Sequence, residues 1–191
     1  MSDQLLFMVL LGCRLPNRHT EQHDIFFAIG TSMKDIIPAI KKFWPEAKGR
    51  LHIDAWRAVT NVDGMAIKIV EKNLFSSPTE VADTQHKLFF LNLGGYKEHD
   101  FEEYHYKLLT VANSLQAASK TAKQTAFYKH TSFEEAVSHI DDKYGVDIDD
   151  AFEVKDILPA IQKEQYKLLI EPCEVLQEDE IHIGYFKLEE F

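Results

Sequence analysis

The 191-residue sequence contains only two cysteines, Cys13 and Cys173, and two cysteines are too few for a disulfide framework. They also lack the Cys-x-x-Cys or Cys/His spacing that is typical of structural metal sites. We therefore interpret both as reduced thiols and expect a cytoplasmic protein. The hydrophobic fraction of 45% is large enough to form a core without covalent or metal staples.

Long hydrophobic runs and basic clusters are also absent. The apolar segment LLFMVLLGC at residues 5–13 is much shorter than the roughly 20 residues of a membrane-spanning helix. No basic residue precedes it and no small-residue cleavage site follows it, so it does not resemble a signal peptide. A net charge of -10 opposes contact with phosphate backbones. We expect neither a membrane nor a nucleic acid among the partners.

The signatures of common enzymes are missing as well. Gly-x-Ser-x-Gly and His-Glu-x-x-His do not occur. The segment LGGYKEHD has two glycines after an apolar run but lacks the Lys-Ser/Thr of a P-loop. The acidic run at residues 141–150 departs from the calcium-loop pattern. The sequence therefore assigns no cofactor and no set of metal ligands.

What the sequence does contain is an internal repeat. LFMVLLGC at residues 6–13 aligns with LFFLNLGG at residues 88–95. The same offset aligns EQHDIFFAIGTS, residues 21–32, with EYHYKLLTVANS, residues 103–114, without a gap. These matches predict a tandem duplication of one module.

Periodicity predicts the elements of each module. Two short apolar runs separated by a polar loop indicate two strands. Ser32 and Ser114 are the expected helix N-caps, and Ser32 begins a Ser-x-x-Asp capping signature. Pro38 requires the first helix either to begin later, capped by Asp35, or to bend. An Asp-Gly pair at residues 63–64 predicts a hairpin after the helix.

We predict an α+β fold, built by tandem duplication of a strand-strand-helix-strand-strand module with mainly antiparallel sheets, plus a C-terminal hairpin. The first module covers residues 1–72 and the second covers residues 86–158, with a polar Ser-Ser-Pro linker between them. The motif HID occurs at residues 52–54 and 139–141, which implies an insertion in the second copy. Residues 159–191 form a C-terminal strand extension, expected to be a hairpin that extends one of the sheets.

Several segments resemble a bacterial family catalogued as domain of unknown function 1543, which occurs as one or two copies per chain. The resemblance covers about residues 6–158 and is carried by LFMVLLGC, EQHDIFFAIG, HIDAW, KLFFLNLGGY, EEYHYKLL, KQTAFYKH and SHIDDKYGVDIDD. It implies a bacterial, soluble, duplicated protein. It implies no activity, ligand or catalytic residue.

Polar residues that recur in both modules are the candidates for chemistry. Histidine and carboxylates bind metals and exchange protons near neutral pH. A His-x-Asp step on a strand places both side chains on one face. We predict a site where the modules meet, although the same residues also have a purely structural interpretation. The catalytic candidates are His52, Asp54, His139 and Asp141, and the ligand-binding candidates are Glu21, His23, Glu103 and His105.

Two classes of function stay open. The first is a non-catalytic binding or assembly module, whose exposed sheet edges favour homo-oligomers. The second is a small enzyme, metal-assisted or not, that uses the paired His and Asp residues at the module interface. We favour the binding module, because no established active-site spacing is present.

Overall fold

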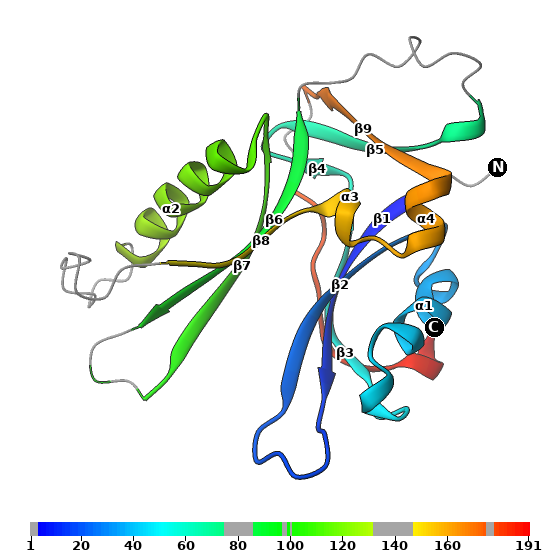
Figure 1. The fold of residues 1–191 in the computed structure, drawn as a ribbon, viewed down its shortest axis with the longest axis vertical. Helices are drawn as coiled ribbons and strands as arrows, with labels where there is room; N and C mark the ends of the chain where they lie inside the picture. The colour runs from blue at the N-terminus through cyan, green and yellow to red at the C-terminus, as the bar shows by residue number, and fades with distance from the viewer. Residues whose placement is uncertain (1–3, 75–85, 97–98, 100, 132–146, 175–177) are drawn as a thin grey trace. The chain divides into compact units, whose positions relative to one another are not determined.

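The computed structural model describes residues 4–74, 86–96, 99, 101–131, 147–174 and 178–191. The chain divides into two compact units. Unit 1 combines Met1–Ala82 with Ile157–Phe191, and unit 2 is Asp83–Asp156. The described strands form antiparallel sheets accompanied by a few helices (Figure 1), which is the predicted α+β class.

The described residues of unit 1 form two sheets. The larger has the strand order β10-β3-β1-β2 and the smaller has the order β4-β5-β9. The Asp-Gly pair at residues 63–64 has positive φ at both positions and joins β4 to β5, as the hairpin signal predicts. The strands are β1 (Leu5–Cys13), β2 (Gln22–Gly30), β3 (His52–Val59), β4 (Asn61–Val62), β5 (Met65–Glu71), β9 (Tyr166–Pro172) and β10 (His182–Lys187).

Helix α1 (Met33–Phe43) packs on one face of the larger sheet. Its Ile36 and Ile40 share one hydrophobic core with alternate residues of β1. The Asp35 carboxylate accepts hydrogen bonds from the backbone N–H groups of Thr31 (2.9 Å) and Ser32 (3.1 Å). The helix therefore begins directly after Ser32, as the capping signature predicts, and Pro38 lies inside it. The β1 residues of this core are Phe7, Val9, Leu11 and Cys13.

Shorter elements complete unit 1. The short helix α4 (Ala160–Gln165) carries Gln162, whose side-chain amide bonds to the backbone of Ile29 in β2 at both the carbonyl (2.7 Å) and the N–H (2.8 Å). The 3-10 turns are η1 (Pro45–Ala47), η2 (Lys72–Leu74) and η3 (Leu188–Glu190). In the described part of the chain, no helix has both the length and the apolar character needed to cross a membrane.

The described strands of unit 2 form a three-stranded sheet with the order β7-β6-β8. Its strands are β6 (Lys87–Tyr96), β7 (Glu103–Ala112) and β8 (Asp147–Glu153). Helix α2 (Leu115–Thr131) follows β7 and buries Ala118 and Ala122 against β6. The Ser114 hydroxyl accepts a hydrogen bond from the Ala117 N–H (3.2 Å), as expected for the predicted N-cap.

The C-terminal strands differ from the predicted hairpin. Strand β9 pairs with β5 and β10 pairs with β3, so the two strands do not pair with each other. Both extend a sheet edge of unit 1, which local alternation of apolar residues does not specify. In unit 2, β8 is followed by the short helix α3 (Val154–Ile157) in place of a second hairpin strand.

The two segments of the predicted repeat have the same local topology. A hairpin is followed by a helix in both, and a later strand pairs with the other edge of the first strand. The β1–β3 register shifts between Leu10 and Leu11, and the β6–β8 register shifts between Asn92 and Leu93. These positions coincide in the sequence alignment. The shared arrangement agrees with duplication, which stays a prediction.

Candidate functional site

The polar cluster of unit 1 is built around a glycine. Gly12 of β1 lies in register with His23 of β2 on one side and with His52 of β3 on the other. Because Leu11 and Cys13 belong to the core beneath α1, alternation places Gly12 on the opposite face of the sheet. Two imidazoles thus flank a position that has no side chain.

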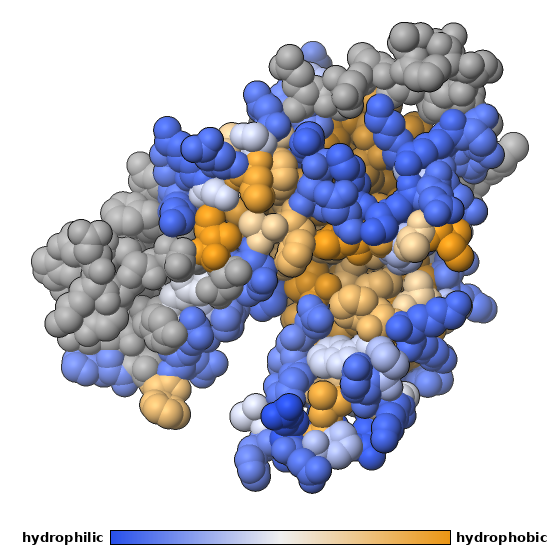
Figure 2. All heavy atoms as spheres, viewed as in Figure 1, coloured by the Kyte–Doolittle hydropathy of each residue, from blue (hydrophilic) through white to orange (hydrophobic). Residues whose placement is uncertain are grey.

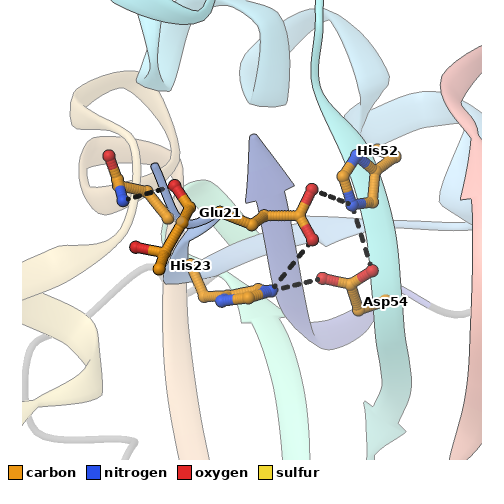
Figure 3. A network of polar contacts seen from close by, with 6 residues as sticks. Glu21, His23, His52 and Asp54 are labelled. Atoms are coloured by element: carbon orange, nitrogen blue, oxygen red, sulfur yellow. Dashed lines mark hydrogen bonds and ion pairs between the residues drawn. The ribbon is translucent and has the colours of Figure 1, made fainter. Parts of the chain in front are cut away.

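A β-bulge brings Asp54 into this cluster. Leu10 pairs with Ala55 and Leu11 pairs with Ile53, so Asp54 is the extra residue of β3. Bulges bend a strand and redirect its side chains, and they are frequent beside functional sites. Glu21, directly before β2, completes the group. Figure 3 shows the polar ends of Glu21, His23, His52 and Asp54 pointing toward one another.

Each imidazole lies close to both carboxylates through its Nε2 atom. His52 Nε2 is 3.3 Å from Glu21 Oε1 and 3.2 Å from Asp54 Oδ1. His23 Nε2 is 3.3 Å from Asp54 Oδ2 and 3.7 Å from Glu21 Oε2. The fold therefore brings together all four candidate residues of the first module.

The cluster is buried at one end and open at the other. His52 is only 4% exposed, whereas the side chains of Glu21 and His23 are 40% and 42% exposed. The adjoining end of the β1–β2 hairpin, at the bottom of the space-filling view, is covered mainly by hydrophilic side chains (Figure 2). A small ligand can therefore reach the cluster from the side of Glu21 and His23.

Two buried atoms of the cluster are not satisfied. Among the described residues, His52 Nε2 and Asp54 Oδ2 have no partner in hydrogen-bond geometry, although both lie within ion-pair distance of a neighbour. An unsatisfied buried polar atom costs about 1–3 kcal/mol. As a hydrogen-bonded network, the cluster is therefore incomplete.

Gly12 and Tyr185 support the cluster, although neither residue was among the candidates predicted from the sequence. A Cβ atom at Gly12 would collide with His52 Nε2 and would lie 2.6 Å from Asp54 Oδ2. The Tyr185 ring of β10 stacks on the His52 ring at 4.3 Å between centroids. The recurrence of Gly12 as Gly94 was a usable signal. Nothing local to Tyr185 indicates its partner, because β10 is far from β3 in the sequence.

The charges of the cluster depend on the protonation of its imidazoles. With both imidazoles neutral, the two carboxylates carry two negative charges and attract cations. Nearby Cys13 does not add a thiolate: burial raises the pKa of its thiol, Arg50 lowers it in part, and Glu21 raises it further. With side chains as they stand, no three His, Cys, Asp or Glu residues in the described parts are arranged to hold a metal ion.

The candidates of the second module are only partly visible. Glu103 Oε2 and His105 Nε2 lie 3.9 Å apart on exposed side chains, and His105 Nδ1 lies 3.4 Å from the Asn92 amide nitrogen. His139 and Asp141 lie outside the described residues. A site that draws on both modules therefore stays a prediction.

The β8 register corrects the alignment of the HID motifs. Asp147 lies opposite Gly94 and Ile148 lies opposite Leu93, as His52 and Ile53 lie opposite Gly12 and Leu11. The structural counterpart of residues 52–54 is therefore the Asp-Ile-Asp of residues 147–149, in place of residues 139–141. The shared Ile-Asp at residues 53–54 and 148–149 is a sequence signal for this match. The identical HID motif at residues 139–141 favoured the other alignment.

Comparisons with known proteins found a family match and a similar solved structure. Residues 18–69, which include all four cluster residues, match one copy of the family described as Domain of Unknown Function (DUF1543). No curated protein matches the chain. The crystal structure of a protein Il1583 from Idiomarina loihiensis is similar over 97% of this chain and 99% of that chain, with 24% sequence identity and a TM-score of 0.63. That similarity shows the fold.

Proposed function

We propose that the chain is a binding module whose ligand site is the cluster of Glu21, His23, His52 and Asp54 in unit 1. The observation that carries this proposal is the convergence of two imidazoles and two carboxylates beside Gly12, with two buried atoms left without a hydrogen bond among the described residues. A network that served folding alone would satisfy its buried polar atoms.

The chemistry of the cluster favours a small cationic ligand. Its open groups are carboxylate oxygens and imidazole nitrogens, and it carries two negative charges when the imidazoles are neutral. The net charge of the chain, -10, adds to this attraction. Exposure of Glu21 and His23 gives such a ligand access.

The proposal is tested by following the NMR signals of the histidine rings. Zinc chloride, magnesium chloride and the organic cation spermidine are titrated separately into the full chain, and the Cε1–H signals are followed by NMR. We expect at least one probe to shift the signals of His23 and His52 more than that of His105. Equal or absent shifts with all three probes would contradict the proposal.

A small enzyme is the second candidate, because Asp54 lies beside both imidazoles at 3.2 and 3.3 Å. A carboxylate next to an imidazole orients the ring and raises its basicity, which suits general acid-base chemistry. Any organic molecule that the cluster binds is then incubated with the protein and analysed by mass spectrometry. A product that forms with wild type but not with His52→Gln would favour the enzyme.

We propose further that the chain acts in the cytoplasm, without nucleic acid, as a homo-oligomer. The free thiols of Cys13 and Cys173 and the negative charge support the first two points. Exposed apolar side chains on the edge strand β10, Ile183 (80%) and Tyr185 (66%), support the third. Sedimentation velocity of wild type and Ile183→Lys tests it, with a monomeric wild type as the contrary result.

A further inference from the structure

We propose that the cluster binds one divalent transition-metal ion, such as Zn²⁺. This inference rests on the proposed function and names the ligand class of the same site. The ligands are Nε2 of His23, Nε2 of His52 and one oxygen each from Glu21 and Asp54.

The donor set has the chemistry that such ions prefer. Two imidazole nitrogens with carboxylate oxygens suit Zn²⁺ and its neighbours among the transition metals, whereas Mg²⁺ and Ca²⁺ prefer oxygen ligands alone. The two carboxylates also balance the charge of a divalent ion when the imidazoles are neutral. Binding then requires both nitrogens to be free of protons.

The separations between donor atoms also suit a metal. In a tetrahedral site with bonds of about 2.1 Å, neighbouring ligand atoms lie about 3.4 Å apart. The nitrogen–oxygen separations here are 3.2, 3.3, 3.3 and 3.7 Å. Each imidazole nitrogen thus already lies at about this separation from one oxygen of each carboxylate.

Both carboxylates must rotate before the four residues can coordinate one ion. Each carboxylate presents different oxygens to the two imidazoles: Glu21 turns Oε1 to His52 and Oε2 to His23, and Asp54 turns Oδ1 to His52 and Oδ2 to His23. This is consistent with the finding that the described side chains, as they stand, hold no metal. The terminal torsion of a carboxylate is broad, so a rotation of each brings one oxygen toward a common centre.

The unsatisfied atoms point to an ion more than to a hydrogen-bonded network. His52 Nε2 is buried between two carboxylates and is not aligned for a hydrogen bond with either one, within the structure described. Asp54 Oδ2 has the same defect. A metal ion accepts lone pairs from all of these atoms and removes both defects.

The surroundings hold the ligands in place. Tyr185 stacks on the His52 ring and fixes its plane, and the bulge sets the position of Asp54. Gly12 keeps the space between the imidazoles free of a side chain. The exposure of Glu21 and His23 gives the ion an entry path from solvent.

The test compares two matched histidine variants in the full, untagged chain. The side chains of His23 and His105 are equally exposed, at 42% each, so His23→Gln and His105→Gln carry the same chemical change at similar cost to folding. After EDTA treatment and dialysis, Zn²⁺ binding is measured by calorimetry at pH 7, and the visible spectrum of the Co²⁺-loaded protein reports coordination geometry. We expect one Zn²⁺ per chain, binding at least tenfold weaker in His23→Gln, and no change in His105→Gln.

The outcomes separate this inference from the proposed function. If wild type binds neither metal, or if both variants bind Zn²⁺ as wild type does, the metal inference is wrong. If the metals fail while spermidine still shifts the His23 and His52 ring signals selectively, the binding site stands and only its ligand class is wrong. If no probe acts at the cluster, both proposals are wrong.

Discussion

Units 1 and 2 share a three-stranded arrangement with a bulge at corresponding positions, but they differ beside the central glycine. His52 lies opposite Gly12 in unit 1, whereas Asp147 lies opposite Gly94 in unit 2. The strand on the other side supplies a histidine in both, His23 and His105. The residue opposite the central glycine on the third strand is therefore a histidine in unit 1 and an aspartate in unit 2. The strand arrangement is thus shared, while among the described residues two imidazoles flank the central glycine in unit 1 alone.

The largest expected effect comes from Gly12→Ala. Its Cβ would collide with His52 and crowd Asp54, and such overpacking costs roughly 1–3 kcal/mol of the free energy of unfolding. We expect this loss in urea unfolding, together with the loss of Zn²⁺ binding. The control is Gly49→Ala, which is strained by its positive φ but meets nothing within 4 Å in the described structure. Gly49→Ala should lower stability and leave Zn²⁺ binding intact. If Gly12→Ala binds Zn²⁺ as well as Gly49→Ala does, the open space at Gly12 is not needed for the site.

A smaller effect is expected from Tyr185→Ala, which removes the ring stacked on His52. Ring pairs contribute about 0.5–1.5 kcal/mol beyond their buried area, so the free energy of unfolding should fall by about 1 kcal/mol. Ile161→Ala in α4 is the control, and it should change stability by less than about 0.5 kcal/mol because Ile161 is 67% exposed and lies outside the β10 edge proposed for the oligomer. If both variants lose the same amount, the stack does not hold His52 in place.

The two helix starts provide a third comparison. The Ser114 hydroxyl caps α2, and Ser114→Ala should lower the free energy of unfolding by about 1 kcal/mol. This cap carries no charge. The loss, measured by thermal unfolding, should therefore be the same at pH 7 and near pH 3. A loss that grows or shrinks strongly between these pH values would contradict this assignment.

The start of α1 depends on the charged carboxylate of Asp35. We expect the smallest change in stability from its replacement. Hydrogen bonds from Thr31 and Ser32 lower the pKa of Asp35. A lowered pKa in the folded state adds stability above the ordinary aspartate value of about 3.9, and this contribution is lost as the pH falls through the folded value. Asp35→Asn should therefore lower the melting temperature at pH 7, and its difference from wild type should shrink as the pH is lowered. A constant difference would show that the charge of Asp35 is unimportant.

Local signals predicted much of this fold. The Ser-x-x-Asp signature placed the start of α1, and the Asp-Gly pair placed the β4–β5 hairpin, because both depend on residues close in sequence. The candidate residues Glu21, His23, His52 and Asp54 were found because they recur or lie two residues apart on a strand.

Long-range pairing was the part that could not be predicted. Strands β9 and β10 have partners in β5 and β3, and a local apolar pattern does not specify which edge a strand joins. The bulge at Asp54 likewise depends on the register between strands, so the sequence alone did not show why Asp54 joins the imidazoles.

The side-chain amide of Gln162 has a consequence for the outer edge of the larger sheet. Strand β2 is an edge of the larger sheet, and a free edge offers its N–H and carbonyl groups to strands of other molecules. The Gln162 side-chain amide accepts a hydrogen bond from the Ile29 N–H and donates one to the Ile29 carbonyl, as the backbone of a neighbouring strand would. At Ile29 the edge strand therefore has no free backbone group to offer to a strand of another molecule, and the side chain that occupies it comes from the C-terminal segment.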